Sequence, residues 1–220
     1  MSPIQDRNKS FKNRRKSGKF NSNSNNSAKV HGGNKKTSRG LVRIIAGTHR
    51  GRRLPVIVSE GLRPTSDRVK ETLFNWLMSS IPGAKCLDMY AGSGGLGIEA
   101  LSRGAEHVTF FESDTKAAEQ VTSNIATLRE HDSATVICSN ILQYQFSQAS
   151  FDVVFIDPPF GKDMVTKSIE LLLTANILSK NCYVYIETGH DDDYTLPANF
   201  SVIKELKTSQ AYARLFQFNA

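Results

Sequence analysis

The strongest constraint on the fold of this chain is the alternation of short apolar stretches with helical ones from Cys86 onward. Strands that are separated by helices pair in parallel through right-handed crossovers, so the pattern predicts an α/β fold. Only residues 207–210 separate the last two strands, which predicts a hairpin and one antiparallel strand. The expected strands are 85–90, 107–112, 134–138, 152–157, 182–187, 200–206 and 211–218, and the expected helices lie near 94–103, 114–130 and 163–178.

A smaller unit precedes this alternation. Two short strands, 42–46 and 52–57, flank the turn at 47–51 and predict a β-hairpin. A helix follows, with cap candidates at 65–67 and an expected end at 82–83. Its apolar positions, including Phe74 and Trp76 as core residues, are Val69, Leu73, Trp76, Leu77 and Ile81. We therefore divide the chain into a basic tail (1–40), a hairpin extension (41–62) and a main domain (63–220).

Positive charge is concentrated in the N-terminal part of the chain. The net charge is +10 over residues 1–40, +5 over 41–70 and −8 over 71–220. Residues 1–40 contain few apolar side chains, so we expect them to be disordered, either as a solubilising tail or in salt-sensitive contact with phosphates. The hairpin predicts a phosphate-binding edge, because four arginines gather there: Arg43, Arg50, Arg52 and Arg53.

Membrane and metal-binding classes are disfavoured. No apolar run approaches the ~18–20 residues of a membrane span, and no apolar segment follows the basic N-terminus as in a secretory signal. Cys86, Cys138 and Cys182 lie in apolar stretches without a CxxC pair or a histidine cluster. We expect three buried free thiols in a reducing cytoplasm and no metal site.

The segment Asp157-Pro158-Pro159-Phe160 follows the apolar run 151–156 and ends the strand, because proline has no N–H for the ladder. The turn leaves a carboxylate, a carbonyl oxygen and an aromatic ring at the carboxyl end of a strand, where open α/β sheets bind their ligands. These groups suit a planar base with an exocyclic amine. The two oxygens would accept its N–H groups, and Phe160 would stack on its face.

The loop from Asp88 to Gly97 links a strand to a helix and contains the spacing GxGxxG, with glycines at 92, 94 and 97. This spacing alone also matches a dinucleotide-binding loop. Asp88 favours another cofactor, because its carboxylate would repel a pyrophosphate but attract the ammonium and sulfonium of S-adenosylmethionine. Glu112, 20 residues after Gly92, suits ribose hydroxyls. Asn140 and Ile141 could border an adenine, although Asn140 could equally be a turn residue.

Together these residues resemble a known family, the bacterial small-subunit ribosomal RNA methyltransferases of the RsmD type, which methylate a guanine on N2. The resemblance covers about residues 41–220. It is carried by the segments 43–47, 61–77, 88–97 and 157–160. The basic tail is longer than the family pattern leads us to expect and inherits nothing from it.

The resemblance implies a class I, Rossmann-like methyltransferase sheet of seven mostly parallel strands with an N-terminal hairpin. It implies that S-adenosylmethionine is bound by Thr65, Asp88, Ala91, Gly92, Gly94, Glu112, Asn140 and Ile141. Asp157, Pro158 and Phe160 would be catalytic. The Arg63-Pro64-Thr65 segment is similar to the N-terminal motif that approaches the methionine carboxylate of the cofactor. We also expect Arg63, with the arginines of the hairpin, to approach RNA. The implied substrate is 16S ribosomal RNA in an assembling small subunit. Separately from the resemblance, we expect a monomer in the cytoplasm.

Three other interpretations stay open from the sequence. The same turn could methylate adenine N6 or an amide nitrogen. The glycine spacing alone would allow a nicotinamide-dependent dehydrogenase, which Asp88 and the turn at Asp157 oppose. A non-catalytic RNA-binding assembly factor could use the basic tail and the arginine hairpin equally well.

Overall fold

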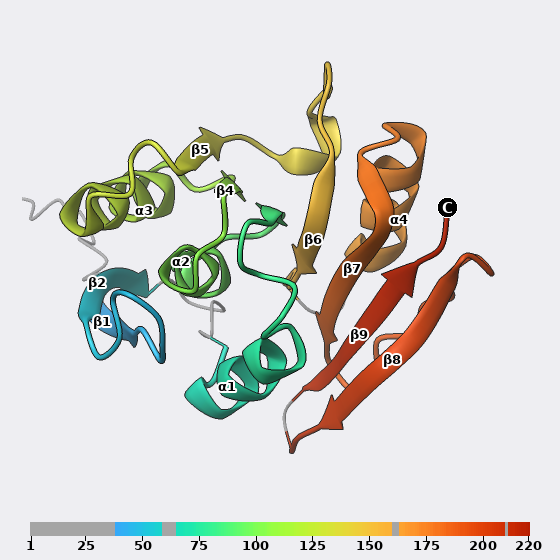
Figure 1. The fold of residues 1–220 in the computed structure, drawn as a ribbon, viewed down its shortest axis with the longest axis horizontal. Coiled ribbons are helices and arrows are strands. Elements are labelled where there is room, and N and C mark those ends of the chain that lie inside the picture. The colour runs from blue at the N-terminus through green and yellow to red at the C-terminus, as the bar shows by residue number, and fades with distance from the viewer. Residues whose placement is uncertain (1–37, 59–64, 160–162, 210) are drawn as a thin grey trace, which may run out of the picture. The chain divides into compact units, whose positions relative to one another are not determined.

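A computed structural model describes residues 38–58, 65–159, 163–209 and 211–220 (Figure 1). The chain divides into two units, 1–35 and 36–220, and all described residues belong to the second. Most of the expected disordered tail and the expected boundary at 62–63 therefore lie outside the described residues. Residues 38–40, which we assigned to the tail, belong instead to the first strand, β1 (Ser38–Arg43).

The main sheet has seven strands in the order β5-β4-β3-β6-β7-β9-β8. All neighbours pair in parallel except β9, which is antiparallel to β7 and β8, so the predicted class is confirmed. The chain runs outward in one direction through β3, β4 and β5 and in the other through β6 and β7. The strand order thus reverses between β3 and β6, where α/β folds bind ligands. The strands are β3 (Lys85–Asp88), β4 (His107–Glu112), β5 (Ala134–Cys138), β6 (Phe151–Ile156), β7 (Leu178–Thr188), β8 (Phe200–Lys207) and β9 (Tyr212–Phe218).

Helices bury both faces of this sheet (Figure 1). One core cluster contains Phe155 and Tyr185 of β6 and β7, and packs against α1 (Asp67–Trp76), α2 (Gly95–Ser102) and α3 (Thr115–Leu128). The other contains Ile156 and Ile186 and packs against α4 (Met164–Thr174). A strand that is covered on both faces has a nearly continuous run of apolar residues in its sequence, which explains why β6 was recognisable from the sequence.

Helix α1 begins where the sequence predicts and ends earlier. The side chain of Ser66 caps it by accepting the N–H of Val69 at 3.3 Å. The helix ends at Trp76 rather than at 82–83, and the chain continues in turns, in which Leu77 and Ile81 remain buried. Phe74 is buried as expected, and Trp76 packs half-buried against the same cluster.

The predicted hairpin forms as an antiparallel pair of β1 with β2 (Arg53–Val58), in which Arg43 lies directly opposite Arg53. The turn of the hairpin packs on the end of α2. The N–H of Thr48 donates to the carbonyl of Ser102 at 2.7 Å. Gly47 has a φ of +83°, and a Cβ there would lie 1.7 Å from the Ser102 carbonyl oxygen, so this contact requires glycine.

Buried charges hold the hairpin on the main domain. Glu99 of α2 is 1% exposed, and its carboxylate accepts the N–H groups of Ile45 at 2.8 Å and Ala46 at 3.0 Å. Arg103 neutralises Glu99 at 2.7 Å. On α1, the ammonium of Lys70 donates to the carbonyl of Arg43 at 2.7 Å. The hairpin is thus held by charge-assisted hydrogen bonds in addition to its apolar contacts.

Two of the three cysteine predictions are correct. Cys86 and Cys182 are buried free thiols in the centre of the sheet. Cys138 is a free thiol but is exposed, because β5 is the edge strand of the sheet and is only partly covered. None of the helices in the described ranges has the length and apolar character that crossing a bilayer requires.

Candidate active site

The glycine loop and the turn at Asp157 leave adjacent strands at the point where the strand order reverses. Asp88, the last residue of β3, pairs with Phe155 of β6, and the N–H of Met89 donates to the carbonyl of Phe155 at 3.1 Å. The loop therefore begins beside the strand that ends in Asp157. The glycine loop and the Asp157 turn, which the sequence singled out, therefore lie next to each other at the carboxyl ends of two central strands.

The glycine loop makes a tight turn into α2. Gly92 and Gly94 have φ values of 52° and 74°, and the N–H of Gly94 donates to the carbonyl of Ala91 at 2.6 Å. Gly97 serves a different purpose. A Cβ at Gly97 would lie 2.1 Å from the ring of Phe110 on β4, so only glycine lets α2 approach the sheet this closely.

Asp88 lies beneath this loop and is 2% exposed. Its Oδ2 accepts the N–H of Gly97 at 3.0 Å. Burial raises the pKa of Asp88 to about 7, the hydrogen bond from Gly97 opposes this rise, and the nearby Glu112 adds to it. Asp88 would therefore act on a ligand through the loop as a buried charge that is only partly ionised at neutral pH.

Glu112, at the end of β4, connects two loops. Its Oε2 accepts the N–H of Gly92 at 2.7 Å, and its Oε1 accepts the N–H of Asp114 at 2.8 Å. The carboxylate is thus held by backbone groups on both sides. It lies where the sequence placed a ribose-binding acid, at the carboxyl end of the strand next to β3.

Asn140 and Ile141 follow β5 and differ in their surroundings. Asn140 is exposed, and its Oδ1 accepts the N–H of Leu142 at 3.1 Å, which makes it the cap of a short 3₁₀ helix, η1 (Ile141–Gln143). The turn that the sequence left open is therefore present. Ile141 is 2% exposed and packs in the core cluster that contains Phe111. Contact of either residue with an adenine stays a prediction.

Asp157 is partly buried, and its Oδ2 accepts the hydroxyl of Thr65 at 3.0 Å. Burial raises its pKa well above the usual range, the neighbouring charge of Glu187 raises it further, and the Thr65 hydrogen bond opposes both. Thr65, which we expected to bind the cofactor, here contacts the catalytic candidate. Pro158 is buried and Pro159 is exposed. Phe160 and Arg63 lie outside the described residues.

A cavity of about 270 Å³ lies against this turn, and the sequence did not reveal it. Pro158 and Pro159 form one wall, the start of α4 at residues 163–165 forms another, and residues 191–194 complete the lining. Asp157, which directly precedes this wall in the chain, does not itself line the cavity.

Glu187 and Tyr185 were also missed. The hydroxyl of Tyr185 donates to Oε2 of Glu187 at 2.7 Å, and Glu187 is 6% exposed. A signal was present in the sequence, because an acid ends the apolar run 182–186 just as Asp157 ends the run 151–156. The adjacency of the two strand ends becomes visible only with the strand order.

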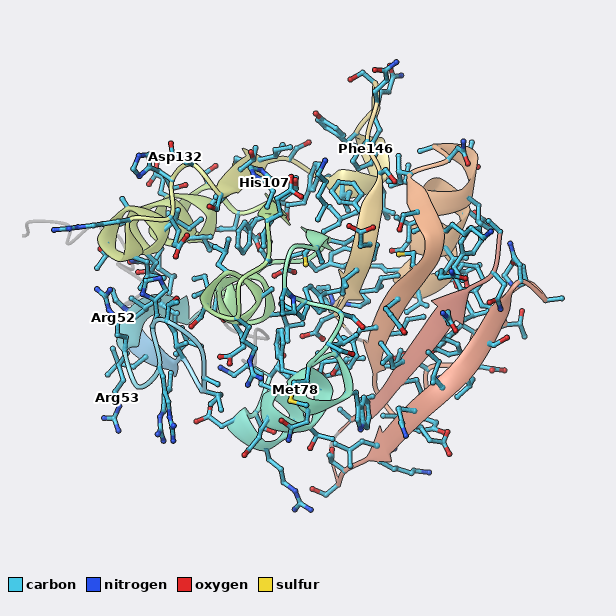
Figure 2. The ribbon with its side chains drawn as sticks, in the orientation of Figure 1. Arg52, Arg53, Met78, His107, Asp132 and Phe146 are labelled. Atoms are coloured by element: carbon cyan, nitrogen blue, oxygen red, sulfur yellow. The ribbon has the colours of Figure 1, made fainter. Side chains whose placement is uncertain are left out.

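The four hairpin arginines, Arg43, Arg50, Arg52 and Arg53, are exposed. Figure 2 shows Arg52 and Arg53 extending from the hairpin. Arg52 is partly engaged, because its Nη2 donates to the carbonyl of Thr127 on α3 at 3.1 Å. Arg43 and Arg53 place two like charges directly opposite each other, which costs stability unless an anion lies between them.

The chemistry of the site fits S-adenosylmethionine. The glycine loop offers close backbone approach, and three acids, Asp88, Glu112 and Asp157, surround it at the ends of neighbouring strands. Such a site favours a ligand that carries an ammonium and a sulfonium. Among the residues that the structure describes, no three His, Cys, Asp or Glu side chains are grouped so that they could hold a metal ion.

The chain is similar to known methyltransferases. Residues 42–217 match the family model described as conserved hypothetical protein 95. The ribosomal RNA small subunit methyltransferase D of Haemophilus influenzae is 49% identical over 82% of this chain and 95% of that protein. Its Escherichia coli K12 counterpart is 43% identical over 82% of this chain and 92% of that protein. The solved structure of Escherichia coli yhhF superposes with a TM-score of 0.75 at 43% identity, over 82% of this chain and 99% of that chain. The chain therefore belongs to the RsmD family of methyltransferases.

Proposed function

We propose that the protein transfers the methyl group of S-adenosylmethionine to the exocyclic N2 of a guanine in small-subunit ribosomal RNA. One observation carries the proposal: the glycine loop after β3 and the Asp157 turn after β6 lie side by side, joined by the hydrogen bond from Met89 to Phe155. A methyl donor held by the loop would thus face an amine held by the turn. The names of the relatives, which specify ribosomal RNA of the small subunit, support the choice of substrate.

On this proposal, S-adenosylmethionine supplies an electrophilic methyl group on a positively charged sulfur. The backbone from Ala91 to Gly94 would hold its methionine part, with the charge of Asp88 beneath. Glu112 would accept the ribose hydroxyls, since each of its oxygens has a lone pair beyond the one used by Gly92 or Asp114. Asn140 and Ile141 would border the adenine.

The turn at Asp157 would hold the target amine. Thr65 fixes Oδ2 of Asp157, which leaves Oδ1 to accept one N–H of the base, while the carbonyl of Pro158 accepts the other. These two hydrogen bonds would favour a pyramidal nitrogen, whose lone pair can attack the methyl group. The carboxylate of Asp157 would stabilise the positive charge that develops on the nitrogen. Stacking on Phe160 would hold a base that has left its own stack.

The exposed arginines Arg43, Arg50, Arg52 and Arg53, together with Arg63, would contact RNA phosphates. Their exposure on the docked hairpin supports this part of the proposal. The protein would act as a monomer in the cytoplasm on an assembling small subunit. The basic tail would add contacts that do not depend on sequence.

The test is methyl transfer to small ribosomal subunits from a strain that lacks this protein, with the modified nucleoside identified by mass spectrometry. We expect N2-methylguanosine, and a loss of ~2–4 kcal/mol of transition-state stabilisation in Asp157→Ala with cofactor affinity retained. The matched control is Asp132→Ala, since Asp132 is a fully solvated acid (Figure 2).

Other products would contradict the proposal in distinct ways. Methylated adenine would keep the chemistry and change the substrate. Binding of RNA and S-adenosylmethionine without transfer to any nucleoside would indicate an assembly factor. Normal turnover in Asp157→Ala would remove this residue from the chemistry.

A further inference from the structure

Two carboxyl groups end neighbouring strands on the same face of the sheet. In the parallel register of β6 and β7, Ile156 pairs with Ile186, so Asp157 and Glu187 are the next residues on the two strands. Phe155 and Tyr185, two residues earlier on each strand, pack in the same core cluster. Because side chains alternate along a strand, Asp157 and Glu187 project to the face that carries Phe155 and Tyr185.

The hydrogen bonds agree with this direction. Tyr185, on the same face two residues before, donates its hydroxyl to Glu187 at 2.7 Å. Thr65, just before α1, which packs on this face, donates its hydroxyl to Asp157 at 3.0 Å. Each carboxyl group therefore has one neutral hydroxyl donor, and neither hydroxyl brings a positive charge.

Among the described residues, the surroundings add negative charge. Asp88 of β3 is close enough to disfavour the ionised form of Asp157, and both members of the pair act on the Tyr185 phenol. On β9, the residue opposite Glu187 is Ala213, which carries no charge. The ion pairs between described residues involve neither Asp157 nor Glu187. Two adjacent carboxyl groups at a buried site cannot both ionise easily.

From this geometry we infer that Glu187 is a positioning residue that sets the protonation state of Asp157, because the two carboxyl groups share a single proton. The inference rests on the proposed function and adds a residue to it. The pair titrates as a unit. In the protein without RNA, the proton resides on Asp157, since the Tyr185 hydroxyl favours an ionised Glu187 and Asp88 disfavours an ionised Asp157. Burial raises the pKa of both groups, which favours retention of this proton.

Arrival of the base displaces the shared proton. N–H groups that donate to Asp157 favour its carboxylate, so the shared proton leaves for solvent and both carboxyl groups are ionised in the reactive complex. In the transfer step the N–C bond forms and the C–S bond breaks, with the electron pair kept by sulfur. The amine then releases one N–H proton to the Asp157 carboxylate, which restores the single proton of the pair.

The test is the pH dependence of kcat for wild type, Glu187→Gln and Tyr185→Phe, each normalised to its own plateau. Activity of the wild type falls on the acid side as Asp157 takes up its proton. Glu187→Gln removes the like charge, so Asp157 ionises more easily and the acid limb moves down by about one pH unit or more. Tyr185→Phe lets Glu187 compete for the proton and moves the limb in the same direction by less.

Two further variants distinguish this from a structural effect. Glu187→Asp keeps a carboxyl group and should retain an acid limb close to that of the wild type. Glu205 is a second glutamate that accepts a tyrosine hydroxyl, from Tyr212, at an exposed site on β8, and Glu205→Gln should leave the profile unchanged. Equal loss of activity at every pH in Glu187→Gln and Tyr185→Phe would overturn the inference.

A second measurement is independent of turnover. Infrared difference spectra of the protein without cofactor should contain, at neutral pH, the C=O band of a protonated carboxylic acid that both Glu187→Gln and Asp157→Asn abolish. A band that persists in both variants would overturn the shared proton. If the wild type transfers no methyl group while the band behaves as expected, the proposed function fails and the carboxyl pair stands.

Discussion

Glu112 and Gly92 are joined by a hydrogen bond of 2.7 Å between Oε2 of the side chain and the backbone N–H of the loop. The same carboxylate binds the N–H of Asp114 at 2.8 Å. An acid that sequence patterns associate with ribose thus also fixes the shape of the glycine loop. On the proposed function, it would act on the cofactor in two ways, by direct contact and by holding the loop in shape.

We expect Glu112→Gln to weaken both the loop and cofactor binding. The N–H groups of Gly92 and Asp114 bond different oxygens of Glu112, and an amide replaces one of these oxygens by an NH₂, which leaves one N–H group without its acceptor. Loss of a hydrogen bond to a charged group costs about 1–3 kcal/mol. Thermal unfolding without ligand and calorimetric titration with S-adenosylmethionine should both reveal this loss. The exposed Glu119→Gln on α3 is the control, and equal effects of the two substitutions would contradict the prediction.

Gly97→Ala should destabilise the fold, because its Cβ would lie 2.1 Å from the Phe110 ring. Overpacking of this kind costs about 1–3 kcal/mol, or more where the backbone cannot move. Urea unfolding measures the change, with Gly95→Ala as the matched control, since a Cβ there meets only the Ser93 hydroxyl, at 3.3 Å, and Val42. Phe110→Leu should partly rescue Gly97→Ala, and additive effects in this double-mutant cycle would exclude the clash as the cause.

The sequence predicted the sheet well because β4 and β5 begin and end where their apolar runs do, and because Asp157 ends β6 with two prolines. It predicted the end of α1 poorly, because Leu77 and Ile81 lie in turns after the helix but are buried and continue its apolar spacing. The Asp157–Glu187 neighbourhood depends on strand order, which local patterns do not encode. The contact between Thr65 and Asp157 spans 92 residues and was unpredictable for the same reason.

Asp88→Asn should stabilise the protein without cofactor above pH 7. Burial raises the pKa of Asp88 from 3.8 to about 7, so between these values the folded state binds more protons than the unfolded state. Stability therefore falls as the pH rises through this window, and the loss is complete above pH 7. Removing the charge should recover at most about 4 kcal/mol.

The measurement is the free energy of unfolding of Asp88→Asn and wild type from pH 4 to pH 8. The difference should be largest at pH 8 and shrink toward pH 4, while affinity for S-adenosylmethionine falls at pH 8. Asp132→Asn, which changes a solvated acid, should give no such trend. A variant that is less stable than wild type at pH 8 would mean that the fold favours the ionised form of Asp88.

The last prediction concerns Arg43 and Arg53, which lie opposite each other on the hairpin. Replacing both by serine should weaken RNA binding and lower the slope of log K against log salt by about 0.7–0.9 for each RNA phosphate that the arginines no longer neutralise. The same change relieves like-charge repulsion, so the melting temperature should stay equal or rise. Lys204→Ser on β8, the strand at the other edge of the main sheet from β5, serves as the control. Weaker RNA binding together with an equal or higher melting temperature would separate loss of an RNA contact from damage to the fold. Weaker binding in a less stable protein would count against the hairpin as an RNA-binding edge, and so would an unchanged salt slope.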